Sequence, residues 1–292
     1  MAGRILHLLS QRPSRTGSGV TLDAVVRLAG RAGWRQQAVV GVPVTETRPV
    51  LGELEAASIL PVFFTDDAEG ELQPHLPFPV TGMSDVMPYR SSVWSTPTMD
   101  RLEDYRRVWK SHLQPVIESF RPDLIHTNHI WLMSSLVKDI APGIPTVATC
   151  HATGLRQMEL CPHLKDEVIA GCRRIDRFCV LRRDHRDQLA AALGIPTDRI
   201  TVTPRTGYGP KTVRLETFAE GAWRPVGDGV TGAEPLREFS FAPVRTSRLR
   251  LVITDAYDPR HPATPRNVQI AELQLFDKDR SIPLAPGGAL SK

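Results

Sequence analysis

The chain has 292 residues, 41% of them hydrophobic, and a formal net charge of +4. At roughly 150 residues per domain this length predicts two domains. No apolar run approaches the roughly 20 residues of a membrane-spanning helix. The small basic excess permits contact with phosphates or with an anionic membrane surface and requires neither, so nucleic acid is not an expected partner.

The N-terminal apolar run after Arg4 is too short for a signal peptide and is not followed by a cleavage site. The cysteines lie in or beside apolar segments without close pairs: Cys150, Cys161, Cys172 and Cys179. We interpret them as reduced core thiols, which predicts a cytoplasmic protein. Their spacing from His151 and His163 fits no compact zinc pattern, so no metal site is expected.

Residues 4–30 are the segment around which the first domain is organised. An apolar run at residues 5–9 predicts a buried parallel strand. Polar residues 11–16 lead to Gly17-Ser18-Gly19, and apolar residues then recur at helical spacing. Strand, glycine loop and helix is the order that builds an anion site in a doubly wound sheet. A βα turn that needs glycine only for its geometry explains the same residues.

Strand and helix signals alternate over the first two-thirds of the chain. Further strands are expected at residues 38–42, 59–64, 123–127, 146–150, 177–181 and 200–203. Helices are expected at residues 101–120, 130–140, 162–174 and 184–193. Residues 71–97 have no steady period and predict a long loop. Repeated βα units predict an α/β domain with a mostly parallel sheet covered on both faces.

The pattern changes after Pro204, where the helical period ends. Strands are expected at residues 212–218, 222–226, 236–241, 249–253 and 268–276. These turn-separated runs predict a smaller antiparallel β domain over residues 205–292, after an α/β domain over residues 1–204. A long loop in this second domain, serving either as a sugar site or as a solvent-exposed turn, contains Asp255, Asp258, Arg260 and His261.

Three segments of the first domain carry a resemblance: RILHLLSQRPSRTGSGVTLDA, RPDLIHTNHIWLMSSLVKDIAP, and TVATCHATGLRQMELCPHL with RFCVLRRDH. Together they resemble the N-terminal half of a GT-B type retaining glycosyltransferase of family 4. The resemblance implies a Rossmann-like domain that binds the acceptor, while a second such domain holds most of the nucleotide sugar. Transfer then takes place in the cleft between the domains, with the nucleotide sugar as co-substrate and no other cofactor.

The resemblance also implies a site. Its substrate-binding positions are Gly17, Ser18, Gly19, Asn128, His129 and His151. His126 is the candidate catalytic residue and is expected in a strand-to-helix loop, where it would hold a sugar hydroxyl. A retaining transfer needs stabilisation of the leaving diphosphate more than it needs a strong base. Alternatively, His129 caps the helix that starts beside it.

The second half departs from that family. After Thr203 no basic clamp is followed by two glutamates separated by seven residues. Instead, FSFAPVRTSRLRLVITDAYD and NVQIAELQLF resemble the later part of a discoidin-type, galactose-binding-like β-sandwich. The opening strands of such a sandwich are missing, which leaves open edges. Either a second chain completes the sandwich or the cleft, or the chain is a truncated or recombined product.

Three hypotheses follow. The first is an enzyme that transfers a sugar from a nucleotide sugar to a sugar or lipid-linked acceptor. The second is a non-catalytic carbohydrate-binding protein, and the third is a product that folds only in its first domain. Four arginines either line an anionic acceptor or a membrane surface, or are solvated helix ends: Arg173, Arg174, Arg182 and Arg183.

Overall fold

The computed structural model describes residues 3–13, 15–66, 72–84, 86–202, 209–230, 242, 244–257, 263, 275–277 and 280–282. The chain divides into two compact units. The first comprises residues 1–180 and 184–202, and the second comprises residues 181–183 and 203–292. Within the described ranges, no helix has the length and apolar character needed to cross a bilayer.

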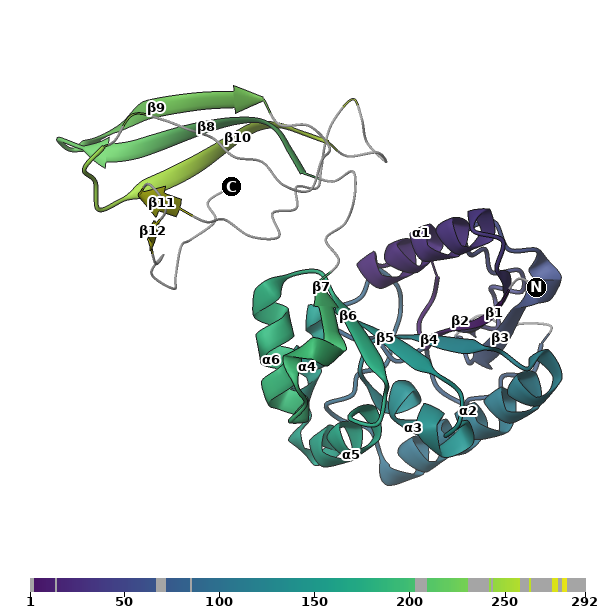
Figure 1. The fold of residues 1–292 in the computed structure, drawn as a ribbon. Coiled ribbons are helices and arrows are strands. Elements are labelled where there is room, and N and C mark those ends of the chain that lie inside the picture. Colours follow the sequence, from purple (N-terminus) through teal and green to yellow (C-terminus); the bar gives the residue numbers. More distant parts are fainter. Residues whose placement is uncertain are drawn as a thin grey trace. The chain divides into compact units, whose positions relative to one another are not determined.

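The first unit is a seven-stranded parallel sheet with helices on both faces (Figure 1). Its strands are β1 (Arg4–Leu9), β2 (Arg35–Pro43), β3 (Ile59–Phe64), β4 (Leu124–Asn128), β5 (Thr146–Cys150), β6 (Arg177–Val180) and β7 (Ile200–Val202). Its helices are α1 (Gly17–Arg31), α2 (Met99–Phe120), α3 (Leu132–Ile140), α4 (Ala152–Leu160), α5 (Pro162–Cys172) and α6 (Arg183–Leu193). Two short 3₁₀ turns, η1 (Ala56–Ser58) and η2 (Thr197–Arg199), precede β3 and β7. The predicted doubly wound sheet is confirmed.

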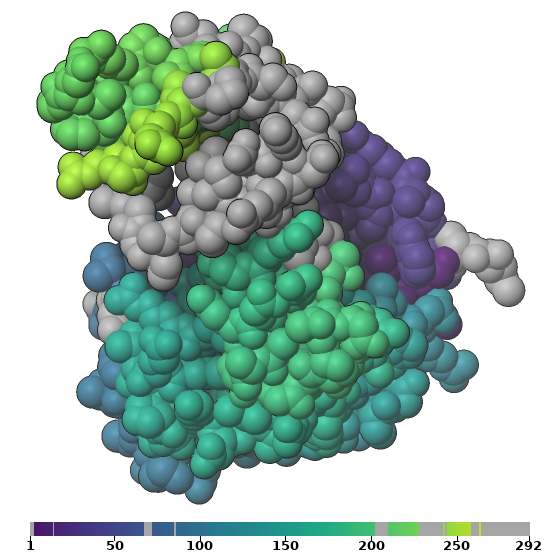
Figure 2. Space-filling view, turned by 60° about the vertical axis from the view of Figure 1, so that its left-hand side comes forward, coloured from purple at the N-terminus to yellow at the C-terminus, as the bar shows by residue number. Residues whose placement is uncertain are grey.

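Successive side chains of β1 enter two different cores because strand side chains alternate between faces. Leu9 packs with Leu22 and Val26 of α1 on one face. Leu6 and Leu8 belong to the larger core on the other face, together with residues of α2, α3, α5 and α6. Burial on both faces explains why the strand reads as a continuous apolar run. In Figure 2 the second half of this unit, coloured teal to green, forms one continuous surface.

Helix α4 was not predicted, because residues 152–160 give no clear helical signal. A glycine near the start of this helix lowers its intrinsic helical propensity. The same glycine allows close packing: a Cβ added at Gly154 would lie 2.9 Å from Cγ1 of Ile130. The close contact between Gly154 and Ile130 therefore stabilises a helix that the local sequence does not predict.

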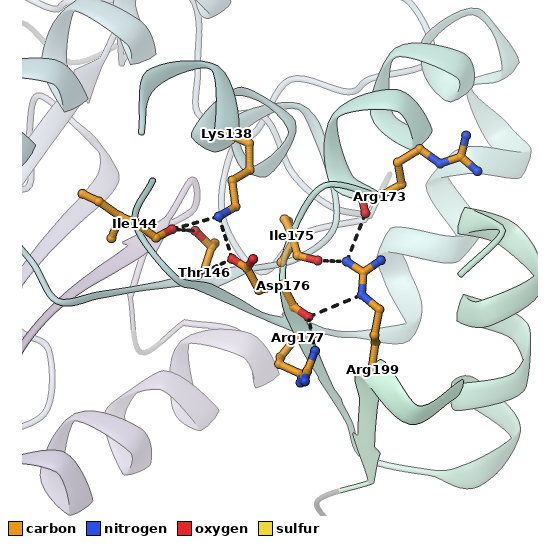
Figure 3. A network of polar contacts seen from close by, with 8 residues as sticks. All are labelled: Lys138, Ile144, Thr146, Arg173, Ile175, Asp176, Arg177 and Arg199. Atoms are coloured by element: carbon orange, nitrogen blue, oxygen red, sulfur yellow. Dashed lines mark hydrogen bonds and ion pairs between the residues drawn. The ribbon is translucent and has the colours of Figure 1, made fainter. Parts of the chain in front are cut away.

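The amino-terminal edge of the sheet is fastened by a polar network (Figure 3). The Lys138 ammonium lies 2.6 Å from the Asp176 carboxylate, which also accepts from the Thr146 amide at 2.8 Å. The Arg199 guanidinium donates to three backbone carbonyls: those of Arg173, Ile175 and Asp176. These contacts join α3, β5 and the segments before β6 and β7. They stabilise the edge of the sheet at which the strands begin.

The second unit contains an antiparallel sheet of β8 (Gly209–Ala219), β9 (Ala222–Val230) and β10 (Leu249–Tyr257) in the order β10-β8-β9. A tight turn joins β8 to β9, with positive φ at both Glu220 and Gly221. Strands β11 (Leu275–Asp277) and β12 (Arg280–Ile282) pair with each other. The strand predicted at 236–241, and most of that predicted at 268–276, lies outside the described residues.

The structure differs from the predicted loop of the second unit at the first residue of that loop, Asp255. Asp255 lies inside β10, where its carboxylate is 2.7 Å from the Lys211 ammonium. The register of β10 shifts on either side of Asp255, which indicates a bulge that holds this polar residue within the strand. Asp258, Arg260 and His261 lie outside the described residues.

Candidate functional site

The order of the strands marks one position on the sheet. Along the chain the strands run outward from β1 through β2 to β3, then resume on the other side of β1 with β4. At such a reversal the connections after the two central strands diverge to opposite faces. Ligands of doubly wound folds bind outside the carboxyl ends of the strands at such a reversal. The segments that border the reversal here follow β1, β4 and β5.

The glycine segment after β1 forms the first turn of α1 instead of the expected loop. Thr16 is the N-cap, and its hydroxyl accepts from the Gly19 amide at 3.4 Å. The Gly19 amide, one of those expected to face an anion, therefore donates to the cap. Ser18 is buried and its hydroxyl contacts that of Thr16 at 2.8 Å.

Gly17 differs from the other two positions because it is exposed, and a Cβ added there would meet no atom of the protein within 4 Å. No packing contact of the described residues therefore requires glycine at this position.

His126 does not lie in the expected loop. It is the third residue of β4, and it is buried within the sheet. Its Nδ1 lies 3.0 Å from Nδ1 of His7, and its Nε2 lies 2.8 Å from the Thr149 hydroxyl. Strand β4 ends at Asn128, one residue beyond the predicted end at residue 127, so His126 lies two residues before the end of the strand. Both ring nitrogens are used by neighbouring strands.

The contacts of His126 belong to a polar chain across four adjacent strands. On the far side, Nε2 of His7 lies 2.9 Å from the Gln36 side-chain oxygen, so that nitrogen carries a proton. Nδ1 of His7 then accepts from His126, which accepts in turn from the Thr149 hydroxyl. Burial lowers the pKa of His7 to about 4 and that of His126 to about 3. Both rings are therefore neutral at pH 7.

His129 lies just beyond the end of β4 and has left-handed backbone geometry, with φ of 65°. Such a conformation costs a non-glycine residue roughly 1–3 kcal/mol and persists where neighbours hold it. Its amide donates to the Thr149 carbonyl at 3.0 Å, and its carbonyl accepts from the Ser134 hydroxyl at 2.5 Å. The residue is buried. The side chain does not cap α3, whose N-cap is Trp131.

The His129 ring is surrounded by polar groups from the segments that follow β1 and β5. Its Nε2 lies 2.8 Å from the Gln11 side-chain nitrogen, and its Nδ1 lies 3.3 Å from the Thr153 hydroxyl. The ring of His151 lies 4.7 Å from it, centroid to centroid. Burial, with a further contribution from His151, holds the pKa of His129 well below its usual range. The site thus contains a neutral histidine held from two sides.

Asn128 completes the group at the end of β4. Its side-chain nitrogen donates to the Leu8 carbonyl at 3.2 Å, which joins β4 to β1 at the strand reversal. Its side-chain oxygen is buried and has no hydrogen-bond partner among the described residues. An orphaned buried acceptor is uncommon in folded proteins and marks a position where a donor is wanted.

Two members of the site were not predicted. Gln11 follows β1 and is buried, and Tyr89 comes from the irregular segment at 72–97. The Tyr89 hydroxyl donates to the Gln11 oxygen at 3.4 Å. A buried glutamine directly after an apolar strand is a signal that the sequence offered. No local sequence pattern indicates that Tyr89 contacts Gln11, which lies 78 positions earlier in the chain.

Among the remaining candidate residues, the arginines at 173 and 174 and the cysteines have structural roles. Arg174 pairs with Asp139, and Arg173 donates to the Leu193 carbonyl, which favours a role at helix ends. Cys150, Cys161 and Cys172 are buried free thiols, and Cys179 is half-buried and free. No group of three or more metal-ligating side chains occurs within the described part of the chain.

Fold and site together define a doubly wound α/β protein with its candidate site at the strand reversal. Residues 52–206, just over half of the chain, match the family model of Glycosyltransferase Family 4. The chain therefore belongs to glycosyltransferase family 4. The matched residues include β3 to β7, with Asn128, His129 and His151, and begin after the glycine segment.

Solved structures give more distant likenesses. UDP-GlcNAc 2-epimerases from Neisseria meningitidis and Methanocaldococcus jannaschii are 12% and 10% identical, with TM-scores of 0.40 and 0.41. Sucrose-phosphate synthase from Thermosynechococcus elongatus is 10% identical, with a TM-score of 0.43. The alignments cover 68%, 70% and 69% of this chain, but only 46%, 46% and 48% of those proteins. The chain thus matches about half of each. A comparison with curated proteins finds no significant match.

Proposed function

We propose that the first unit binds a sugar at the strand reversal between β1 and β4, and that the chain takes part in transfer from a nucleotide sugar to a sugar or lipid-linked acceptor. One observation supports this most: the carboxyl ends of β1, β4 and β5 bring Gln11, Asn128, His129 and His151 together at the strand reversal. In a chain of this family, that is where a ligand is expected.

The chemistry follows from a neutral imidazole beside a helix start. A neutral ring at His129 donates a hydrogen bond to a sugar oxygen without adding charge. The first turn of α1 contributes the positive end of a helix dipole, which favours a diphosphate near Gly17 and Ser18. Preorganised dipoles of this kind stabilise charge as it develops on a leaving group. No strong base is required for a retaining transfer.

Of the two candidate histidines, we favour His129 as the one that contacts sugar. His126 is the third residue of β4 and lies inside the sheet, whereas His129 follows the end of that strand, so the catalytic role of His126 stays a prediction. His129→Ala is expected to lower sugar binding or turnover at least tenfold while the chain stays folded. His126→Ala is expected to lower the free energy of unfolding, because it strips buried partners from His7 and Thr149.

Non-catalytic carbohydrate binding is the second candidate function. It is favoured by the described part of the second unit, which is an antiparallel sheet and not a second helix-flanked parallel sheet. We propose that this unit is a partial discoidin-type sandwich, completed by a second chain. Buried free thiols support a cytoplasmic location. Peripheral membrane contact is proposed from the basic excess alone.

A paired assay separates the candidates. The purified chain is incubated with a panel of nucleotide sugars, with and without sugar acceptors. Release of nucleoside diphosphate is followed together with sugar binding by calorimetry. Acceptor-dependent release supports transfer, and binding of sugars without release supports the non-catalytic function. Neither release nor binding across the panel would contradict both.

A further inference from the structure

Two hydrogen bonds connect the irregular segment at 72–97 to the His129 ring, and a third joins the ring to Thr153. The Tyr89 hydroxyl contacts the Gln11 oxygen at 3.4 Å, and the Gln11 nitrogen contacts Nε2 of His129 at 2.8 Å. Nδ1 of His129 contacts the Thr153 hydroxyl at 3.3 Å. Gln11 and His129 are both buried, so water does not substitute freely for these partners.

The direction of each hydrogen bond follows from its donors. The phenolic proton of Tyr89 needs an acceptor, and the Gln11 side-chain oxygen lies 3.4 Å from the hydroxyl. The Gln11 oxygen is that acceptor, and this turns the amide NH₂ towards His129. A neutral imidazole has one donor and one acceptor nitrogen. Nε2 of His129 therefore accepts from Gln11, and the proton of the ring lies on Nδ1.

The reverse arrangement leaves the hydroxyl proton of the half-buried Tyr89 without its acceptor in the protein. If the Gln11 amide were flipped, its oxygen would accept from Nε2–H of His129. Its nitrogen would then face Tyr89, whose proton would lose the Gln11 oxygen as its acceptor. A donor that is removed from water and left without a partner destabilises the arrangement that contains it. Thr153 does not decide between the two, because a hydroxyl donates or accepts equally well.

Tyr89 is itself held in place. The Arg12 guanidinium lies over its ring, 5.2 Å from the centroid, and donates to the Glu46 carboxylate at 2.7 Å. The Arg12 and Glu46 side chains are each about one-fifth exposed. The phenol is thus oriented by two elements, the connection after β1 and the one after β2.

We propose that Tyr89 and Gln11 are positioning residues that fix the proton of His129 on Nδ1, so that the ring presents a hydrogen-bond donor on its Thr153 side. This rests on the proposed function, in which a sugar oxygen takes the place of the Thr153 hydroxyl as the acceptor of that proton. The irregular segment that carries Tyr89 thereby sets whether His129 donates or accepts. A role limited to packing would not depend on the phenolic hydroxyl.

The test is ¹⁵N NMR of the full chain labelled at histidine, without any sugar. His129 is assigned by the signal lost in His129→Gln. In the wild-type chain, Nε2 of His129 is expected in the unprotonated range and Nδ1 in the protonated range. Tyr89→Phe keeps the ring but loses the hydroxyl, and is expected to give a mixture of both tautomers.

Gln11→Glu replaces the donor by a carboxylate of the same shape. It is expected to move the proton to Nε2 and to raise the pKa of His129. Tyr257→Phe and Gln114→Glu, the same changes elsewhere, are expected to leave the His129 signals in place. A wild-type ring protonated on Nε2, or a Tyr89→Phe spectrum identical to the wild type, would overturn the proposal. These readouts need no substrate, so absence of sugar binding would contradict the proposed function and leave this result intact.

Discussion

Gly17 and Gly143 are exposed glycines. Gly17 lies near the carboxyl ends of the parallel strands, and Gly143 lies near their amino ends. A Cβ added at either position would meet no atom within 4 Å. Gly17 opens α1 beside the carboxyl ends of the strands, whereas Gly143 precedes β5 at the other edge. The protein itself therefore tolerates a side chain at both. Only a ligand at the strand reversal would distinguish them.

Gly17→Val is accordingly expected to change the free energy of unfolding by less than about 1 kcal/mol and to weaken sugar or nucleotide-sugar binding at least tenfold. Gly143→Val serves as the control and is expected to change neither. Urea unfolding and calorimetric titration measure the two effects. Equal binding by both variants would remove the glycine segment from the site.

At this scale the sequence brought candidate residues to the carboxyl ends of neighbouring strands, but it placed His126 in a loop although the residue lies inside β4. The order of strand and polar residues placed Asn128, His129 and His151 at one edge, because parallel strands end together. The exact end of β4 decides whether residue 126 or 129 leaves the sheet, and strand ends are weakly encoded. Tyr89 was beyond prediction, since its place depends on long-range packing of an aperiodic segment.

Strands β1 and β4 share the buried polar chain that contains His7 and His126. We expect this chain to make the free energy of unfolding depend on pH. The folded chain keeps His7 and His126 neutral, with pKa values of about 4 and 3, whereas unfolded histidine has a pKa near 6.5. As pH falls below 6.5, the unfolded chain binds protons that the folded chain does not. The free energy of unfolding then falls by up to about 1.4 kcal/mol per pH unit for each ring, until the folded pKa is reached.

His126→Gln removes one such ring without adding a charge. We expect its free energy of unfolding, measured in urea from pH 7.5 to 5.0, to fall less steeply with acid than that of the wild type. His163→Gln changes an exposed histidine and is expected to keep the wild-type slope. Identical slopes for all three proteins would show that the buried chain does not control the acid response.

Helices α3 and α5 pack so closely that a glycine separates them. A Cβ added at Gly171 would lie 2.4 Å from the Ser135 Cβ and 2.5 Å from its carbonyl oxygen. Backbone cannot move aside as a side chain does, so overpacking here outweighs the gain of roughly 1 kcal/mol in helical propensity. Gly171→Ala is expected to destabilise the fold by about 1–3 kcal/mol.

Gly30→Ala, the same change in α1, is the matched control. Its added Cβ would meet only the side-chain nitrogen of Gln36, at a van der Waals distance of 3.4 Å. A gain of up to about 1 kcal/mol is expected there. Thermal unfolding of the two variants should therefore move in opposite directions. A stabilised Gly171→Ala chain would mean that the two helices are not packed as described.

For the whole molecule, the sequence predicted both fold classes because period and composition change together after Pro204. Strand β7 closes the parallel sheet at Val202, and the described strands beyond it are antiparallel. We propose that residues 1–202 fold alone. A chain ending at Val202 is expected to unfold cooperatively in urea with the far-ultraviolet signature of an α/β protein. An unfolded fragment alongside a folded full chain would contradict the proposed boundary.

The central claim, that a sugar binds at the strand reversal between β1 and β4, is tested most directly by titrating the ¹⁵N-labelled full chain with nucleotide sugars and acceptor sugars. Amide shifts are expected to move at Gly17, Ser18, Asn128, His129 and His151, and to stay unchanged at Gly143 and Asp176 on the opposite edge. Saturable shifts confined to other parts of the chain would contradict the account.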